Sequence, residues 1–301
     1  MGHDIQGNLG SISYARYGGL IDAAKVAAMR ISVVGVGGAA SLVINLARLG
    51  VGHLHLVDFD RLADANPATQ AFGAHEVGRL KVDALAAEVA AINPSTRVCT
   101  SAVRYQELAA ERDEVWSADL ILAMTDDFGT QALINRHAIR YRKDTLFAAA
   151  YPQAAAVEIT GTLQPPHPQG VGCHRCLTFS RYRAYARGFT LTGPIPSHIF
   201  QAEYVNALLG NLIVSRVTKG ALWKQFATRP ILISRIDPQY CSEPNQAFAA
   251  PPEFSLFTTV QWHSEAGEGF VCPDCQSTPE SRGPGIYPRR YRRPRTCATN
   301  P

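Results

Sequence analysis

The segment from Ile31 to Ser41 constrains the fold of this chain most strongly. It starts as a short run suited to a buried strand, passes through Gly35-Val-Gly-Gly-Ala-Ala, and leads into an apolar helical stretch over 42–49. Such a turn places the helix N-terminus at the end of the strand, where free N–H groups and the helix dipole favour a phosphate. Gly37 lets a phosphate approach the backbone, and Ala40 is small enough for the helix to pack on the strand. The segment therefore predicts the first unit of a dinucleotide-type α/β fold.

Strands and helices alternate through the first half of the chain. Besides the strand and helix around the glycine loop, we expect a helix over 21–29, strands over 53–58, 98–105, 119–125 and 146–151, and helices over 77–92 and 128–141. This alternation predicts a Rossmann-like, doubly wound and mostly parallel sheet. Later in the chain, the pattern indicates a strand over 155–163, a helix over 200–219 and a strand over 230–236, with the rest irregular.

We expect one extended domain with an appended C-terminal portion. The predicted parts are an N-terminal segment 1–29, a nucleotide-binding core 30–151, a C-terminal portion 152–277 and a basic tail 278–301. The tail holds six arginines against one glutamate, so the net charge of +4 is local to it, and a segment this rich in Pro and Arg is expected to be solvated and disordered. Nucleic acid is therefore not an expected partner. With no apolar run long enough for a bilayer and no leader-like N-terminus, we expect a cytoplasmic protein.

Four of the seven cysteines form two Cys-x-x-Cys pairs, which are Cys173 with Cys176 and Cys272 with Cys275. In a reducing compartment such pairs indicate metal rather than disulfides. Two pairs can complete a tetrahedron around Zn²⁺ and leave no position for water or substrate, so we expect a structural zinc site. Redox dithiols are the alternative. His174 lies between two of the cysteines and is expected to be a bystander.

The strand expected over 53–58, the first after the glycine loop, ends at Asp58, whose carboxylate can accept hydrogen bonds from ribose hydroxyls. The glycine loop and this aspartate do not distinguish ATP from NAD or FAD. The residues that follow distinguish the nucleotides. Asp58 and Asp60 form an Asp-x-Asp pair, Asn66 and Gln70 come next, Gly78-Arg-Leu-Lys81 precedes a helix, and Asn93-Pro94 ends that helix.

These motifs resemble the family of ubiquitin-activating-like enzymes that includes the bacterial ThiF, MoeB and HesA proteins. That family has Asp-x-Asp at a strand end, then Ser-Asn-Leu-x-Arg-Gln, then Gly-x-x-Lys and a helix ending in Asn-Pro. The run Met124-Thr-Asp-Asp127, with Asn135 on the next helix, resembles the family's Thr-Asp-Asn segment. The resemblance extends from about Arg30 to Tyr151 and includes the two cysteine pairs.

The resemblance implies that the protein binds ATP and Mg²⁺ and attaches AMP to the C-terminal carboxylate of a ubiquitin-like protein, a sulfur-carrier protein or a small peptide. It implies a homodimer, in which Arg16 would reach the neighbouring subunit's site. Lys81 would supply a cation for the leaving pyrophosphate and Asp126 a contact to Mg²⁺. The residues expected to bind the nucleotide are Gly35, Gly37, Gly38, Asp58, Asp60, Asn66, Gln70, Lys81, Asp126 and Asp127.

The sequence departs from the family pattern in its arginines. Thr69 stands where the family has a phosphate-contacting arginine, and Gln131 stands at the next arginine position. Another cation, such as Lys81, Arg16 or Arg79, replaces the missing charge, or turnover is weak or absent. Two alternatives therefore stay open: a non-catalytic nucleotide-binding relative, and a nicotinamide- or flavin-dependent oxidoreductase.

A nucleophilic cysteine is also an open question. Many relatives carry one after the first cysteine pair, but the stretch from Leu177 to Lys219 has none. Cys241, in a polar loop, is the one plausible candidate, and adenylation without transfer to cysteine is the simpler interpretation.

Overall fold

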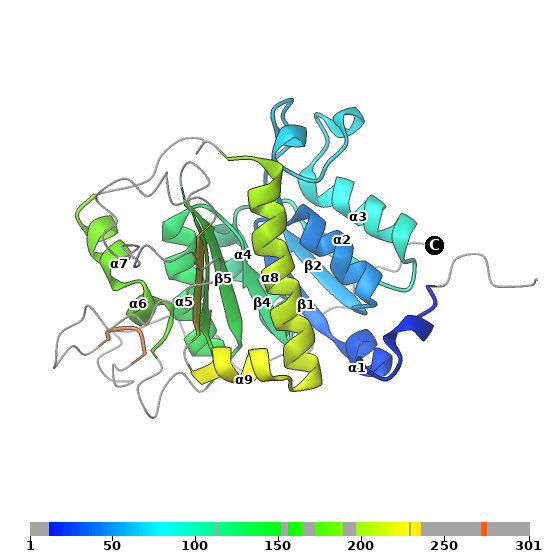
Figure 1. Ribbon diagram of the computed structural model, residues 1–301. Helices are drawn as coiled ribbons and strands as arrows, with labels where there is room; N and C mark the ends of the chain where they lie inside the picture. Colours follow the sequence, from blue (N-terminus) through cyan, green and yellow to red (C-terminus); the bar gives the residue numbers. More distant parts are fainter. Residues whose placement is uncertain are drawn as a thin grey trace, which may run out of the picture.

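A seven-stranded sheet forms the centre of the part of the chain that the structure describes (Figure 1). This structure is a computed structural model that describes residues 12–111, 114–151, 156–164, 172–188, 197–228, 230–235 and 272–275. The strands lie in the order β3-β2-β1-β4-β5-β6-β7. Their bounds are β1 Arg30–Val34, β2 His53–Val57, β3 Arg97–Ser101, β4 Leu120–Ala123, β5 Thr145–Ala150, β6 Ala156–Thr162 and β7 Ile231–Arg235.

The first five strands are parallel, and β6 and β7 continue the sheet in antiparallel pairing. The order reverses between β1 and β4, so the carboxyl ends of these two strands flank a topological switch point, where open α/β sheets bind ligands. The predicted fold class, a doubly wound and mostly parallel α/β sheet, is confirmed.

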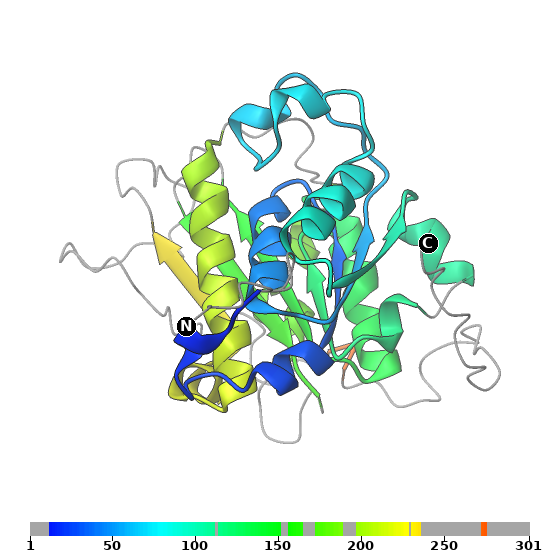
Figure 2. The same ribbon diagram turned by 90° about the vertical axis from the view of Figure 1, so that its right-hand side faces the viewer.

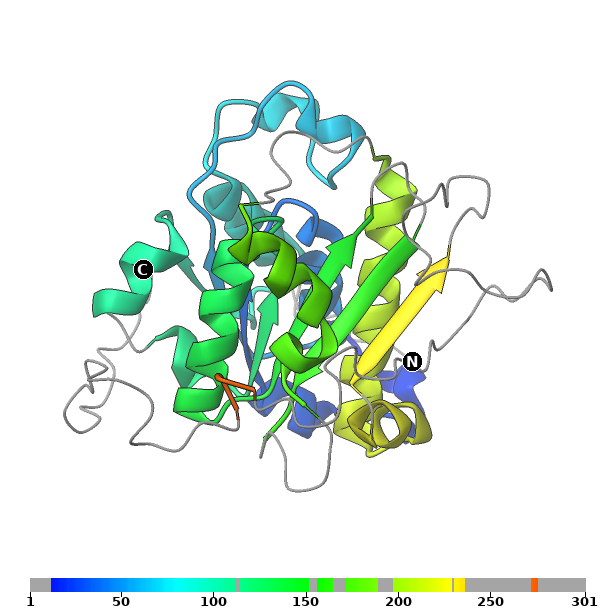
Figure 3. The same ribbon diagram turned by 90° about the vertical axis from the view of Figure 1, so that its left-hand side faces the viewer.

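Helices cover both faces of the sheet (Figures 2 and 3). Alternate strand residues face opposite sides: Ile31 and Val33 belong to one buried cluster, and Val34 to the other. The first cluster packs under α2 (Ala40–Leu49), α3 (Lys81–Ile92) and α8 (Ile199–Thr218), and the second under α4 (Tyr105–Glu111) and α5 (Phe128–Tyr141). The remaining helices are α1 (Ala23–Ala28), α6 (His174–Leu177), α7 (Phe179–Ala186) and α9 (Ala221–Thr228), with short 3₁₀ turns Ala15–Tyr17, Asn66–Ala68, Ala74–Glu76 and Val115–Ser117.

The C-terminal portion shares the sheet and the core of the first half. β6 pairs along β5, and α8 packs on α2 with Leu209, Leu212 and Ile213 fully buried. The division at 151/152 therefore falls between two paired strands, and the domain boundaries stay a prediction.

Several predicted elements differ from the structure. The helix expected over 77–92 begins at Lys81, because Gly78 takes φ +92° and the chain still turns there. The strand expected over 98–105 ends at Ser101, and Tyr105 begins the unpredicted helix α4. The expectation of irregular structure also missed α7 and α9. Among the described helices, none combines the length and the hydropathy needed to cross a membrane.

Candidate nucleotide site and cysteine cluster

The glycine loop lies against the end of β4. Gly35 has φ +83°, and a Cβ there would lie 2.7 Å from Thr125 N and 2.9 Å from the Met124 carbonyl carbon. Only glycine therefore allows this approach without displacing backbone. The next residues open α2, whose N-cap, Ala39, makes no side-chain capping bond. The Ala40 N–H donates to the Gly37 carbonyl at 3.2 Å, and the next N–H groups of the first turn, those of Ser41 and Leu42, are left to donate to an anion at the switch point.

Asp58 connects the end of β2 to this loop. Its Oδ2 accepts a hydrogen bond from Val36 N at 2.9 Å, and its Oδ1 accepts one from Asp60 N at 2.9 Å. Burial raises the pKa of the carboxyl group above its usual value, and the two backbone N–H donors oppose that rise. The side chain is held in one orientation beside the glycine loop, and each oxygen keeps a further lone pair for a ribose hydroxyl.

Lys81 is the first residue of α3 and is held at the same edge. Its Nζ lies 3.0 Å from Asp60 Oδ2, and its backbone N–H donates to the Asp60 carbonyl at 3.0 Å. The lysine side chain is only 8% exposed, whereas that of Asp60 is 45% exposed. The ammonium is therefore anchored from one side, and the charge of Lys81 also lowers the pKa of Asp58.

The segment 61–80, cyan in Figure 1, carries Asn66, Thr69 and Gln70 above the carboxyl edge. Asn66 organises its own turn: Oδ1 accepts from Ala63 N at 2.8 Å, and its carbonyl accepts from Gln70 N at 2.8 Å. The Gln70 carboxamide reaches the loop, since a Cβ on Gly37 would lie 2.9 Å from its Oε1. Thr69 donates its hydroxyl to the Asn66 carbonyl and brings no charge.

The segment after β4 places two aspartates at the edge in different roles. Asp127 is the N-cap of α5, where its Oδ2 accepts from Thr130 N at 2.8 Å. Asp126 is exposed, and within the described ranges its side chain makes no hydrogen bond or ion pair. Gln131, at the family's arginine position, is buried and donates to the Thr125 carbonyl at 2.7 Å. A nucleotide role for Asp127 stays a prediction beside its cap role.

The two arginines proposed to replace the missing charge point elsewhere in this chain. Arg16 lies in a turn whose Tyr17 hydroxyl donates to the Leu49 carbonyl at 2.9 Å, at the end of α2 remote from the glycine loop. Arg79 pairs with Glu76 at 3.2 Å. Of the cations considered, Lys81 is the one that the structure brings to the loop and Asp58.

One contact at this edge escaped sequence reasoning. The Arg104 guanidinium carbon lies 3.9 Å from the centroid of the Phe59 ring, which is 45% exposed. Both residues lie within three positions of the end of a strand, Phe59 after β2 and Arg104 after β3, and this position is the one signal that the sequence offered for the contact.

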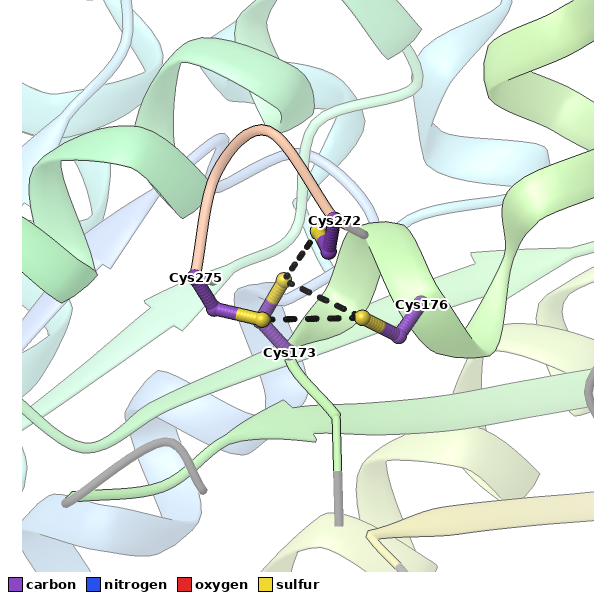
Figure 4. Close-up of side chains that lie close together, drawn as sticks. All are labelled: Cys173, Cys176, Cys272 and Cys275. Carbon is purple, nitrogen blue, oxygen red and sulfur yellow. Dashed lines mark hydrogen bonds between the residues drawn. The ribbon is translucent and has the colours of Figure 1, made fainter. Parts of the chain in front are cut away.

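The four paired cysteines converge into one cluster, as expected (Figure 4). Their sulfurs all lie within 4.8 Å of one another, with separations of 4.0 Å for Cys173–Cys176, 3.8 Å for Cys173–Cys272 and 3.6 Å for Cys176–Cys275. A tetrahedron with Zn–S bonds of about 2.3 Å requires sulfurs about 3.8 Å apart. The sulfur positions therefore fit a zinc ion bound by four thiolates.

Neighbouring side chains brace the cluster. Asn135 is fully buried on α5: its Nδ2 donates to Asp274 Oδ2 at 2.9 Å, and its Oδ1 accepts from Thr162 Oγ1 at 2.7 Å. Arg175 pairs with the other oxygen of Asp274 at 3.0 Å. Hydrogen bonds among the sulfurs, the one with Cys176 foremost, raise the pKa of Cys173, whereas those with Cys173 and Cys176 lower the pKa of Cys275. Four thiolates this close together would repel one another, and a bound zinc ion would neutralise their charge.

His174 is a bystander to the cluster in geometry as well as in sequence. Its Nδ1 lies 2.7 Å from Thr160 Oγ1, and its ring stacks on Phe147 with centroids 4.0 Å apart. Figure 1 shows the segment 272–275 (orange) well away from the cyan segment 61–80, which suits a structural metal. Cys241 and the basic tail lie outside the described residues.

The sequence profile of the ThiF family matches residues 12–233, which is most of the chain. The chain belongs to the ThiF family. Among curated ThiF-like relatives, it is 36% identical over 124 residues to the probable adenylyltransferase/sulfurtransferase MoeZ of Mycobacterium tuberculosis, covering 40% of this chain and 31% of that one. It is 31% identical over 176 residues to the adenylyltransferase and sulfurtransferase UBA4 of Yarrowia lipolytica, covering 54% and 42%. The chain therefore spans less than half the length of these relatives.

Solved structures share the fold. Escherichia coli MccB with ATP has a TM-score of 0.55 at 17% identity, covering 71% of this chain and 63% of MccB. PaaA has a TM-score of 0.57 at 15% identity, covering 72% of each chain. At these identities the likeness concerns the fold alone. Membership of the ThiF family rests on the sequence match.

Proposed function

We propose that this ThiF-family protein binds ATP at the carboxyl edge of its sheet and transfers AMP to the C-terminal carboxylate of a small protein or peptide. The observation that carries the proposal is the meeting of the glycine loop, Asp58 and Lys81 at the switch point, directly beside Thr125 and Asp126. Each of these groups suits one part of a nucleoside triphosphate.

Each group at this edge is suited to a different part of ATP. Asp58 accepts from the ribose hydroxyls, and the uncapped N-terminus of α2 receives phosphate oxygens. Lys81 supplies positive charge where the leaving pyrophosphate forms. Asp126, an exposed carboxylate at the same edge, would hold Mg²⁺, which neutralises phosphate charge when bound.

The reaction follows from this arrangement. An oxygen of the acceptor carboxylate attacks the α-phosphorus, a phosphorus–oxygen bond forms, and the bond to the bridging oxygen breaks as pyrophosphate leaves. Negative charge grows on that bridging oxygen in the transition state. Fixed N–H groups and an anchored ammonium are suited to stabilising this charge, because they need little reorganisation as it develops.

The acceptor class is inferred from the relatives. Structures of E. coli MccB include complexes with ATP and with MccA, and curated relatives include ubiquitin-like modifier-activating enzyme 5 of several species. A protein or peptide with a free C-terminal carboxylate, such as a ubiquitin-like or sulfur-carrier protein, is the acceptor we propose. Zinc in the cysteine cluster, a homodimer completed by Arg16 and a cytoplasmic location belong to the same proposal.

A second candidate is a nucleotide-binding relative without turnover. Three features favour it: Thr69 and Gln131 stand at the family's arginine positions, and Lys81 is paired with Asp60. ATP–pyrophosphate exchange with ubiquitin-like and peptide acceptors separates the two. Exchange supports the enzyme, whereas ATP binding without exchange for any acceptor supports the second candidate.

Calorimetric titration with ATP and NAD tests the nucleotide itself. We expect ATP to bind more tightly than NAD, and Asp58→Ala to weaken ATP binding by about 1.5–3 kcal/mol, the range for a charged hydrogen-bond partner. Asp119→Ala is the matched control, because Asp119, like Asp58, accepts a backbone N–H at 2.9 Å, here that of Arg30 at the start of β1 and so at the opposite edge of the sheet. Tighter binding of NAD would contradict the proposal.

A further inference from the structure

A residue of the C-terminal portion holds the glycine loop. Asn206, on α8, is 3% exposed, and its Nδ2 lies 2.8 Å from the Gly38 carbonyl oxygen and 2.8 Å from Ser41 Oγ. Gly38 and Ser41 flank the start of α2, whose first turn is the proposed phosphate site. Sequence reasoning could not find this contact, because 165 residues separate Asn206 from Ser41.

The orientation of the Asn206 carboxamide follows from its neighbours. A carbonyl oxygen only accepts, so the atom that faces the Gly38 carbonyl must be the nitrogen. The two hydrogens of that nitrogen serve Gly38 and Ser41, one each. The Asn206 oxygen is then buried without a partner among the described residues. The side chain thus leaves its own acceptor unsatisfied while it donates twice to the loop.

This orientation determines what the Ser41 hydroxyl can do. Because Ser41 Oγ accepts from Asn206, its proton is free to be donated elsewhere, and within the described ranges no acceptor for it is found. Ser41 lies in the first turn of α2, where no N-cap side chain accepts a hydrogen bond from the helix N–H groups. A phosphate oxygen at this helix terminus is the acceptor that fits.

The packing of α8 on α2 makes the contact rigid. Gly210, one turn beyond Asn206, has Leu42 as its nearest neighbour, with 3.9 Å between the position of a Cβ and Leu42 Cδ1. Leu209 and Ile213 are fully buried in the same layer. Asn206 therefore approaches the loop from a fixed helix rather than from a surface loop.

Resting on the proposed ATP site, we propose that Asn206 is a positioning residue: it fixes the Gly38 carbonyl and directs the Ser41 hydroxyl to a phosphate of the bound nucleotide. The role is specific to phosphate. Binding of adenosine, which has no phosphate, is independent of both side chains.

Displacement of a fluorescent ATP analogue by ATP and by adenosine tests this role. We expect Asn206→Ala and Ser41→Ala each to weaken ATP binding about tenfold or more, as for a hydrogen bond to a charged group, and to change adenosine binding less than twofold. The double variant should lose little more than either single variant, because the two residues act through one contact. Asn206→Asp should weaken ATP binding more than Asn206→Ala does, since a carboxylate oxygen would face the Gly38 carbonyl oxygen.

Asn211→Ala is the control on the same helix. Asn211 is exposed, and among the described residues its side chain donates to the Ala207 carbonyl of its own helix alone, at 2.9 Å, so wild-type ATP affinity is expected. Thermal unfolding checks that each variant folds, and if Asn206→Ala does not, Ser41→Ala carries the test. Unchanged ATP affinity in the variants, or equal losses for ATP and adenosine, would overturn the role of Asn206. Wild-type protein that binds no ATP would overturn the proposed function as well.

Discussion

The charge on Lys81 should matter far more for catalysis than for stability. Its ion pair with Asp60 is 3.0 Å long, but Asp60 is 45% exposed, so water screens the pair and its contribution to the free energy of unfolding is about 0.2–1 kcal/mol. In the transition state, the same ammonium faces charge that develops on the leaving pyrophosphate. A contact of that kind is typically worth about 2.7–4 kcal/mol. Removing it should therefore slow adenylation about a hundredfold to a thousandfold.

The assay is ATP–pyrophosphate exchange with a cognate acceptor, together with urea unfolding. Lys81→Ala removes the charge and the buried stem, whereas Lys81→Met keeps most of the stem, and both should lose exchange activity to a similar extent. Lys25→Ala is the matched control: Lys25 pairs with Asp22 at the same 3.0 Å, on α1, but with 70% of its side chain exposed. Exchange by Lys81→Ala at the wild-type rate would refute the reasoning, because the phosphates would then be stabilised by other groups.

Three further predictions concern the metal, the glycine loop and pH. Cys272→Ser should abolish zinc binding in metal analysis. It should also lower the free energy of unfolding by up to about 4.7 kcal/mol, the loop-closure contribution of a cross-link spanning 99 residues. Full zinc content in this variant would contradict the assignment. Gly35→Ala should lower the free energy of unfolding in urea by more than about 2 kcal/mol, because φ +83° and the Cβ contact with Thr125 N both oppose alanine. Gly38→Ala is the control, since a Cβ at Gly38 would have nothing within 4 Å, and its stability should stay near that of the wild type. Burial lowers the pKa of His137 from its ordinary 6.5 to about 4. As pH falls, the histidine of the unfolded chain is therefore protonated before that of the folded protein, and stability should be lost between about pH 6.5 and about pH 4. The loss should be about 1–3 kcal/mol for this partly exposed ring, and His137→Gln, which cannot take up the proton, should flatten the profile; an unchanged profile would speak against this origin.

Local sequence signals were sufficient where each residue's role depended on its neighbours in the chain. The glycine loop, Asp58 and the start of α5 at Phe128 could be predicted, because a strand, a turn and a helix each have a short pattern. The four cysteines could also be assigned to one cluster, since four thiolates at this spacing have few other uses.

Residues whose role depends on distant partners could not be predicted. Asn206 and Asn135 sit in ordinary helical patterns, and only the packed structure shows the first on the glycine loop and the second beside the cysteines. The helix α4 was missed because Val103 to Tyr105 continue a strand-like apolar pattern. Tyr105 is in fact buried against α5, with its hydroxyl 2.8 Å from His137 Nδ1. Tertiary burial outweighed the local pattern there.

The packing of α8 on α2 has a consequence for the order of events during synthesis. The strand and helix around the glycine loop leave the ribosome early, but the helix that covers α2 and carries Asn206 is made more than 150 residues later. Until then, the buried side of α2 that includes Leu42 and Leu46 lacks part of its cover. Contacts of such long sequence separation form late and slow folding. A nascent chain should therefore acquire its nucleotide affinity only after α8 has emerged, however early its glycine motif is translated.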